Sequence, residues 1–116
     1  MHELSIMEGV MDMVRESAVQ HNISKVSRLK LVIGKLTMVL PDSLQFSFQV
    51  LSQDEMFRDA VLDIETRDIK ILCKQCELNS TLEDGYSFVC PGCGANDVEL
   101  ISGRELYLDN YEGEDN

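Results

Sequence analysis

Two cysteine pairs organise the sequence: Cys73-Lys-Gln-Cys76, and after 13 further residues Cys90-Pro-Gly-Cys93, followed by Gly94. Two residues between cysteines allow a tight turn to direct both thiolates at one ion, while backbone amides donate hydrogen bonds to sulfur. Gly94 permits the unusual backbone dihedrals that follow such a turn. Two of these turns, facing each other across a hairpin, predict a closed tetrahedral site of four thiolates.

Structural Zn(II) is the ion that this spacing favours, with rubredoxin-like iron and a redox-active dithiol pair as alternatives. The cysteine segment, about 25 residues long, is too short to build its own hydrophobic core, so a metal ion is expected to hold it together. A four-thiolate site has no open position for water or substrate. Because the chain also lacks a Ser-His-Asp set and a phosphate-binding loop, it is not expected to be an enzyme.

The charge of the chain disfavours nucleic acid as a partner. Its 116 residues carry 21 acidic and 10 basic side chains, for a net charge of −11. Residues 73–116 alone hold 10 acids and 2 bases, and four thiolates around a divalent cation add a further local charge of about −2. Phosphate binding depends on Lys and Arg, so DNA or RNA is not expected to bind.

The N-terminal sequence and the hydropathy predict a cytoplasmic protein. No apolar run approaches the roughly 18 residues that a membrane span needs, so no membrane association is expected. The first residues carry acids where a signal peptide would carry bases. In a reducing compartment, four cysteines are more often metal ligands or redox thiols than disulfides.

A helix is predicted from Ser5 to about His21 and Asn22, because apolar residues recur at steps of three and four. Ser5 and Glu8 fit a capping box at its start. Asn22 suits the left-handed conformation just past a helix end. For His21 we expect dipole and capping contacts at the helix end instead of metal ligation.

Further elements surround the cysteines on both sides. The pattern predicts a strand at 28–34 with Leu29, Leu31 and Ile33 on its buried face. It predicts a helix from Pro41 with Leu44, Phe48 and Leu51 on one face. Strands are also predicted at about 60–66 and at 105–108, and a frayed tail at 112–116. The cysteine module is therefore expected to be an insertion between two strands of one sheet.

The first three residues, Met1-His2-Glu3, offer nitrogen donors. By default, a histidine next to a chain terminus is a solvated residue on a frayed end. The terminal amine, the next backbone nitrogens and the imidazole of His2 can nevertheless lie in one plane, and planar nitrogen sites favour divalent nickel or copper. Methionine aminopeptidase prefers small second residues, so Met1 is expected to remain.

At this point the sequence resembles a known family. Its motifs are similar to those of the HypA/HybF hydrogenase nickel-incorporation proteins: Met1-His2-Glu3-Leu4-Ser5, Ile33-Gly34 with the run from Pro41 to Phe48, the two cysteine pairs, and Gly103-Arg104-Glu105-Leu106. The resemblance covers almost the whole chain in the same order. It implies an α+β fold with two helices packed on a small mixed β-sheet and an inserted zinc ribbon with rubredoxin-like knuckles.

The resemblance also implies a division of the chain. Residues 1–68 and 102–116 would form the nickel-binding domain and residues 69–101 the zinc-ribbon domain. His2 is the implied essential nickel ligand, with Met1 contributing its terminal amine and Glu3 a backbone nitrogen or second-shell contacts. Cys73, Cys76, Cys90 and Cys93 are the implied ligands of structural Zn(II). Relatives often carry an acidic residue where this chain has Leu40, so no second-shell carboxylate is assigned to that position, and Asp42 is a candidate substitute.

The implied function is nickel metallochaperone activity during maturation of [NiFe]-hydrogenase. Ni(II) would be a transient cargo, delivered to the hydrogenase large subunit together with a HypB-type GTPase, and some relatives also serve urease maturation. The protein is expected to be a monomer or homodimer. The alternatives are a zinc-ribbon protein-interaction module and a rubredoxin-like redox protein.

Overall fold

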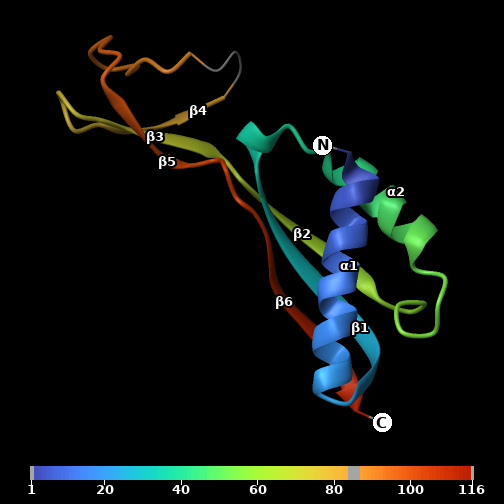
Figure 1. The fold of residues 1–116 in the computed structure, drawn as a ribbon. Helices are drawn as coiled ribbons and strands as arrows, with labels where there is room; N and C mark the ends of the chain where they lie inside the picture. Colours follow the sequence, from blue (N-terminus) through green and yellow to red (C-terminus); the bar gives the residue numbers. More distant parts are fainter. Residues whose placement is uncertain (1, 84–86, 116) are drawn as a thin grey trace. The chain divides into compact units, whose positions relative to one another are not determined.

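The computed structural model describes residues 2–83 and 87–115, and the chain groups into two compact units. The first unit comprises Met1–Val32, Val39–Glu65 and Tyr107–Asn116. The second comprises Ile33–Met38 and Thr66–Leu106, which include all four cysteines. Over the described residues the fold contains two α-helices, two three-stranded β-sheets and an inserted pair of cysteine knuckles, so the predicted α+β class is confirmed (Figure 1).

Helix α1 (Glu3–Gln20) starts two residues earlier than predicted. His2 is the N-cap residue, and no side chain caps the helix, so the predicted capping box of Ser5 and Glu8 is wrong. The backbone explains the difference, because the amide of Ile6 already donates to the carbonyl of His2 at 3.1 Å. The predicted end is confirmed, since Asn22 is left-handed with φ of 58°. The apolar stripe of α1 is buried: Ile6, Met7, Val10, Met11, Val14 and Ala18.

Helix α2 (Pro41–Leu51) begins at the predicted proline and packs beside α1 (Figure 1). Its inner face buries Leu44 and Phe48. Phe57, in the connection that follows α2, is fully buried and meets the Phe48 ring edge-on at a centroid distance of 6.4 Å. The guanidinium of Arg15 lies 4.9 Å from the centroid of the Phe57 ring. Neither helix, within the described part of the chain, is long and apolar enough to cross a membrane.

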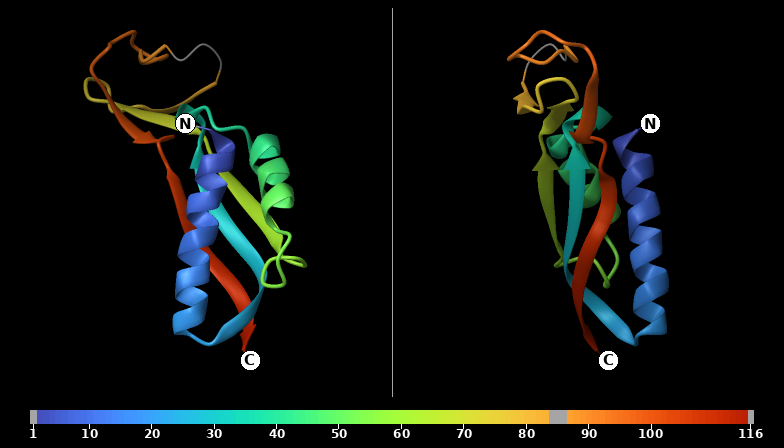
Figure 2. Two further views of the ribbon diagram at one scale, coloured as in Figure 1. Left: turned by 45° about the vertical axis from the view of Figure 1, so that its right-hand side comes forward. Right: turned by 90° about the vertical axis from the view of Figure 1, so that its left-hand side faces the viewer.

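The first sheet has the strand order β2-β1-β6. Strands β1 (Ile23–Gly34) and β2 (Val61–Arg67) run in the same direction, and β6 (Leu106–Asp115) runs in the opposite one (Figure 2). Leu29, Leu31 and Ile33 are buried as predicted, and Val32, which was expected on the other face, is buried as well.

The C-terminal residues 112–115 belong to β6, so the predicted frayed tail is wrong for these residues. The hydroxyl of Ser27 donates to the carbonyl of Glu112 at 3.1 Å. Gly113 fits closely against β1, because a Cβ there would lie 2.6 Å from the carbonyl oxygen of Lys25. These contacts join residues far apart in the sequence, so the polar sequence of the tail does not indicate them.

The second unit contains a 3-10 turn at Lys35–Thr37 and a sheet of order β4-β3-β5. Strand β3 (Ile69–Cys73) pairs antiparallel with β4 (Asn79–Leu82) and with β5 (Val98–Ser102). All three strands lie in sequence between β2 and β6 of the first sheet, so the predicted insertion is confirmed. Gly34 and Gly103 approach closely in this unit, since a Cβ on Gly34 would lie 2.1 Å from the Gly103 backbone.

Candidate metal sites

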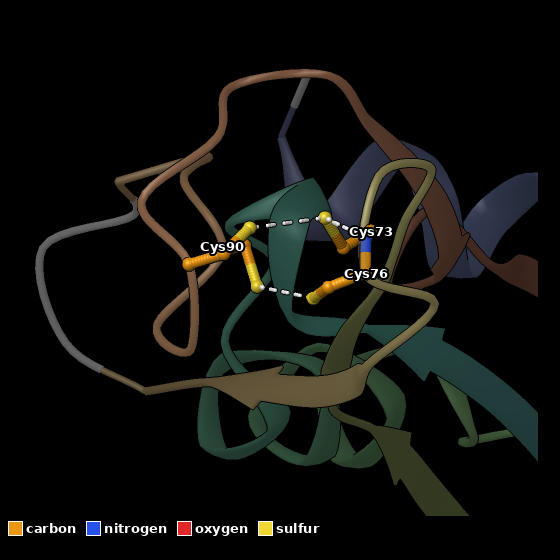
Figure 3. A group of neighbouring side chains, drawn as sticks. Cys73, Cys76 and Cys90 are labelled. Carbon is orange, nitrogen blue, oxygen red and sulfur yellow. Dashed lines mark hydrogen bonds between the residues drawn. The ribbon is translucent and has the colours of Figure 1, made fainter.

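The four cysteines converge in the second unit. Their sulfur atoms all lie within 4.8 Å of one another, and all four thiols are free. The Sγ of Cys73 is 3.6 Å from that of Cys93, and the Sγ of Cys76 is 3.5 Å from that of Cys90. Cys73 and Cys76 belong to one turn and face Cys90 of the other (Figure 3). The two pairs that the sequence singles out therefore form a single cluster.

The two cysteine turns have the same backbone geometry, and we call them the first knuckle (73–77) and the second knuckle (90–94). The amide of Glu77 donates to the carbonyl of Cys73, and that of Gly94 donates to the carbonyl of Cys90, both at 2.9 Å. Glu77 and Gly94 each follow the last cysteine of their knuckle with a positive φ, of 63° and 79° respectively. Strand β3 positions the first knuckle, because it ends at Cys73.

Backbone amides also point at sulfur, as the spacing predicts. The amide of Cys76 donates to the Sγ of Cys73, and the amide of Gly92 donates to the Sγ of Cys90, both at 3.4 Å. The amide of Cys76 is the main reason that the pKa of the Cys73 thiol is lowered to about 7. The pKa of Cys90 is lowered as well, chiefly by the amide of Cys93.

The other two thiols are shifted the opposite way. Although the amide of Leu78 lowers it, the pKa of Cys76 is raised to about 12 by contact with the Cys90 thiol and by burial. Although the amide of Ala95 lowers the pKa of Cys93, contact with the Cys73 thiol and burial raise it overall. Each raised value reflects two sulfur atoms that cannot both be anionic without a cation between them.

The cluster has the dimensions of a four-coordinate metal site. Thiolates 2.3 Å from a tetrahedral zinc ion lie about 3.8 Å apart, whereas a disulfide joins two sulfurs at about 2.05 Å. The observed separations of 3.5 and 3.6 Å match the first case. Four sulfur donors suit a thiophilic ion such as Zn(II) or iron. Once all four bind, no position remains for substrate, so the cluster can stabilise the second unit but offers no catalytic centre.

The N-terminal candidate residues have a different setting. Met1 lies outside the described residues. His2 is exposed at the start of α1, and its imidazole makes no capping hydrogen bond. Glu3 is half-buried, and its Oε2 accepts a hydrogen bond of 3.4 Å from the amide of Leu40. Among residues 2–83 and 87–115, the four cysteines are the only group of three or more His, Cys, Asp or Glu side chains close enough to share an ion.

A hollow of about 410 Å³ lies beside His2, between the first turns of α1 and α2. Asp42, the predicted substitute candidate, shares this hollow with His2, and no local sequence signal indicates that the two residues lie together. The remaining histidine, His21, behaves as predicted, because its Nδ1 lies 2.8 Å from the carbonyl oxygen of Ser17 at the end of α1. The residues that line the hollow are His2, Glu3, Leu4, Asp42, Ser43, Phe46 and Ser47.

An α+β fold with a four-thiol cluster and an exposed histidine at its first helix is that of a metal-binding protein, and comparison with known proteins defines the class further. The family described as "Hydrogenase/urease nickel incorporation, metallochaperone, hypA" matches residues 1–113. The chain therefore belongs to the HypA family.

Individual relatives match over almost their full length. The hydrogenase maturation factor HypA of Moorella thermoacetica is 39% identical over 98% of this chain and 100% of its own. The corresponding protein of Lawsonia intracellularis is 33% identical over the same shares of the two chains. The solution structure of the nickel metallochaperone HypA from Helicobacter pylori has the same fold, with a TM-score of 0.67 at 23% identity and full coverage of both chains.

Proposed function

We propose that this protein binds Ni(II) at its N-terminus and delivers the ion during maturation of [NiFe]-hydrogenase. The observation that carries the proposal is the setting of His2, which is exposed beside a hollow and whose imidazole makes no capping hydrogen bond at the start of α1. Membership in a family of nickel-incorporation metallochaperones supports nickel as the cargo. The protein acts as a carrier, so no catalytic residue is proposed.

The proposed nickel donors are nitrogen atoms. They are the terminal amine of Met1, the backbone nitrogens that follow it, and the imidazole of His2, with Glu3 contributing a backbone nitrogen or outer contacts. Four nitrogens in one plane favour divalent nickel over ions that prefer oxygen or tetrahedral sulfur. Because these donors belong to the exposed start of the chain, ligands of a second protein can replace them one at a time.

The proposed resident ion is structural Zn(II), held by Cys73, Cys76, Cys90 and Cys93. The residues fit this ion, because the four sulfurs already converge and two of them accept backbone amides. Bound zinc supplies a cross-link between the two knuckles. In this proposal residues 1–68 and 102–116 handle nickel, and residues 69–101 form the zinc ribbon.

The proposed partners follow from the family. They are a HypB-type GTPase, the hydrogenase large subunit that receives nickel and, as for relatives in the hydrogenase and urease family, urease maturation proteins. The proposed location is the cytoplasm. The oligomeric state is either a monomer or a homodimer.

Calorimetric titration with nickel tests the N-terminal site. The native chain is compared with His2→Ala and with a chain that carries two extra residues before Met1. Both changes remove nitrogen donors. Loss of a group that only hydrogen-bonds to a metal ligand weakens metal binding by up to about 100-fold, so loss of a donor itself should weaken nickel binding by at least that factor. His21→Ala is the matched control, because it removes the other imidazole and should leave nickel binding unchanged. Equal binding by all four proteins rules out the site.

Elemental analysis tests the resident ion. The purified protein should contain one zinc per chain, retained in His2→Ala. A red sample that contains iron would instead identify a rubredoxin-like centre.

A further inference from the structure

The hollow beside His2 has an apolar wall whose side chains are exposed to solvent. Phe46 is 67% exposed and Leu4 is 43% exposed, and both line the hollow. On the same helix, Leu44 and Phe48 are 0% and 4% exposed and supply the contacts to the core. Phe46 therefore belongs to the outer face of α2, whereas Leu44 and Phe48 belong to its buried face.

The polar wall of the hollow is acidic. Glu3 and Asp42 line it, and no Lys or Arg is among its described lining residues. Glu3 accepts the amide of Leu40, whereas Asp42 is exposed in the first turn of α2. An occupant of the hollow is therefore expected to combine an apolar side chain with a cationic one.

His2 connects this surface to the cargo. Nickel can leave an imidazole directly to a second protein only when that protein brings its own ligands to the imidazole. Because His2, Phe46 and Leu4 line the same hollow, a protein segment that reaches nickel on His2 is within reach of Phe46 and Leu4 as well. Exposed aromatic side chains are frequent at the centres of such interfaces.

We propose that the hollow formed by Leu4, Asp42 and Phe46 is the docking site for the protein that accepts nickel. The accepting segment places an apolar side chain against Phe46 and Leu4, a Lys or Arg at Asp42, and a metal-binding side chain at His2. This inference rests on the proposed nickel cargo, since it concerns how that cargo leaves. A second copy of this chain is a poorer occupant, because its net charge of −11 repels another acidic copy.

The test is the rate of nickel transfer from the loaded protein to the purified nickel-free hydrogenase large subunit. Phe46→Ser should slow transfer about tenfold, the effect of losing a central interface contact. Val50→Ser is the matched control, because Val50 is 48% exposed on the same helix but does not line the hollow, and its transfer rate should stay within about twofold of native.

Charge is tested separately by the salt dependence of the transfer rate. The rate for the native protein should fall as salt rises, and Asp42→Asn should reduce that dependence. Glu16→Gln removes an equal charge from the exposed face of α1, away from the hollow, and should leave the salt dependence unchanged.

Extraction of nickel by EDTA separates failure of this inference from failure of the nickel site. A small chelator needs no docking surface, so Phe46→Ser and native protein should lose nickel to EDTA at the same rate. If Phe46→Ser transfers nickel to the large subunit as fast as Val50→Ser does, the docking proposal is overturned while the nickel site stands. If Phe46→Ser only abolishes self-association seen by sedimentation, the occupant is a second copy and the proposal is likewise overturned. If the native chain holds no nickel at His2, the proposed function itself fails.

Discussion

The four-cysteine cluster and the N-terminal residues differ in the origin of their metal donors. The cluster draws four side chains from two knuckles, and its sulfurs already converge to within 4.8 Å. The N-terminus offers one exposed imidazole, and its remaining candidate donors are backbone nitrogens. Cys73 and Cys90 are each 1% exposed, whereas His2 is open to solvent.

This difference corresponds to two roles for a metal ion. A convergent and partly buried set of thiols holds an ion whose departure would leave sulfur anions facing one another. An exposed set at a chain end can exchange its ion with a second protein without any change in the core. In the proposed function, the cluster maintains the fold, and the exposed N-terminal residues hold and release the cargo.

The largest expected effect comes from breaking the cluster with Cys90→Ser. The second unit should lose its fold while the first unit keeps its own, because structural zinc contributes an apparent 10–16 kcal/mol in small domains, about as much as the whole stability of a typical fold. Hydrogen exchange measured by mass spectrometry should show loss of amide protection in β3–β5 and retained protection in α1.

Lys74→Ala is the control for this prediction. Lys74 lies between the two cysteines of the first knuckle, is exposed, and offers no sulfur. Its replacement should leave exchange unchanged throughout the chain. Protected amides at Ile69–Cys73 in the Cys90→Ser protein would show that the strands hold without the metal.

Features that depend on residues close together in the chain could be predicted from the sequence. The cysteine knuckles are local, since two residues separate the cysteines of each turn and Gly94 follows the second one, and their spacing alone indicates the cluster. Helix α1 is long and periodic, and Pro41 marks the start of α2. Local signals of this kind predict elements well.

Features that depend on distant contacts were missed. Phe57 is part of the core through Phe48 and Arg15, but no periodicity marks it within the connection after α2. Strands β3, β4 and β5 have only four or five residues, too few for a pattern of alternation to stand out. The hollow beside His2 depends on the first turns of two helices coming together, which no local motif records.

Acidification should release nickel at a higher pH than zinc. Backbone nitrogens and imidazole bind metal only without their protons, so nickel affinity should fall about tenfold per pH unit for each proton displaced. In the cluster, backbone amides keep the pKa of Cys73 and Cys90 low, and a bound cation replaces the thiol contacts that raise the pKa of Cys76 and Cys93. Thiolate ligands should therefore keep their ion to lower pH.

This order of release can be measured with protein that carries both ions. The sample is taken stepwise from about pH 8 to about pH 5, the range over which imidazole titrates, and each filtrate is analysed for nickel and zinc. His2→Ala, loaded with zinc alone, should show the same zinc release as native protein. Release of zinc before nickel, or of both together, contradicts the proposed roles of the two sites.

The smallest expected effect distinguishes the two knuckles within the cluster. Gly94→Ala should destabilise the second unit by about 1–2 kcal/mol, because its φ of 79° is unfavourable for a residue with a Cβ, although nothing lies within 4 Å of that position. Glu77 adopts the same conformation with a φ of 63° and bears that strain already. Glu77→Gly should therefore stabilise the unit, because it relieves this strain. The greater entropy of glycine in the unfolded chain offsets part of the gain and leaves on the order of 0.5 kcal/mol.

Both stability changes can be measured by unfolding zinc-loaded protein in guanidinium while hydrogen exchange of the β3 amides is monitored. Glu77→Gln separates conformation from charge, because it removes the carboxylate beside the anionic cluster while keeping the Cβ. If Glu77→Gln stabilises the unit as much as Glu77→Gly does, repulsion from the thiolates dominates at this position and backbone strain does not. If only the glycine variant gains stability, the first knuckle holds a strained residue where the second has a glycine, and the two halves of the cluster differ in stability although their geometry matches.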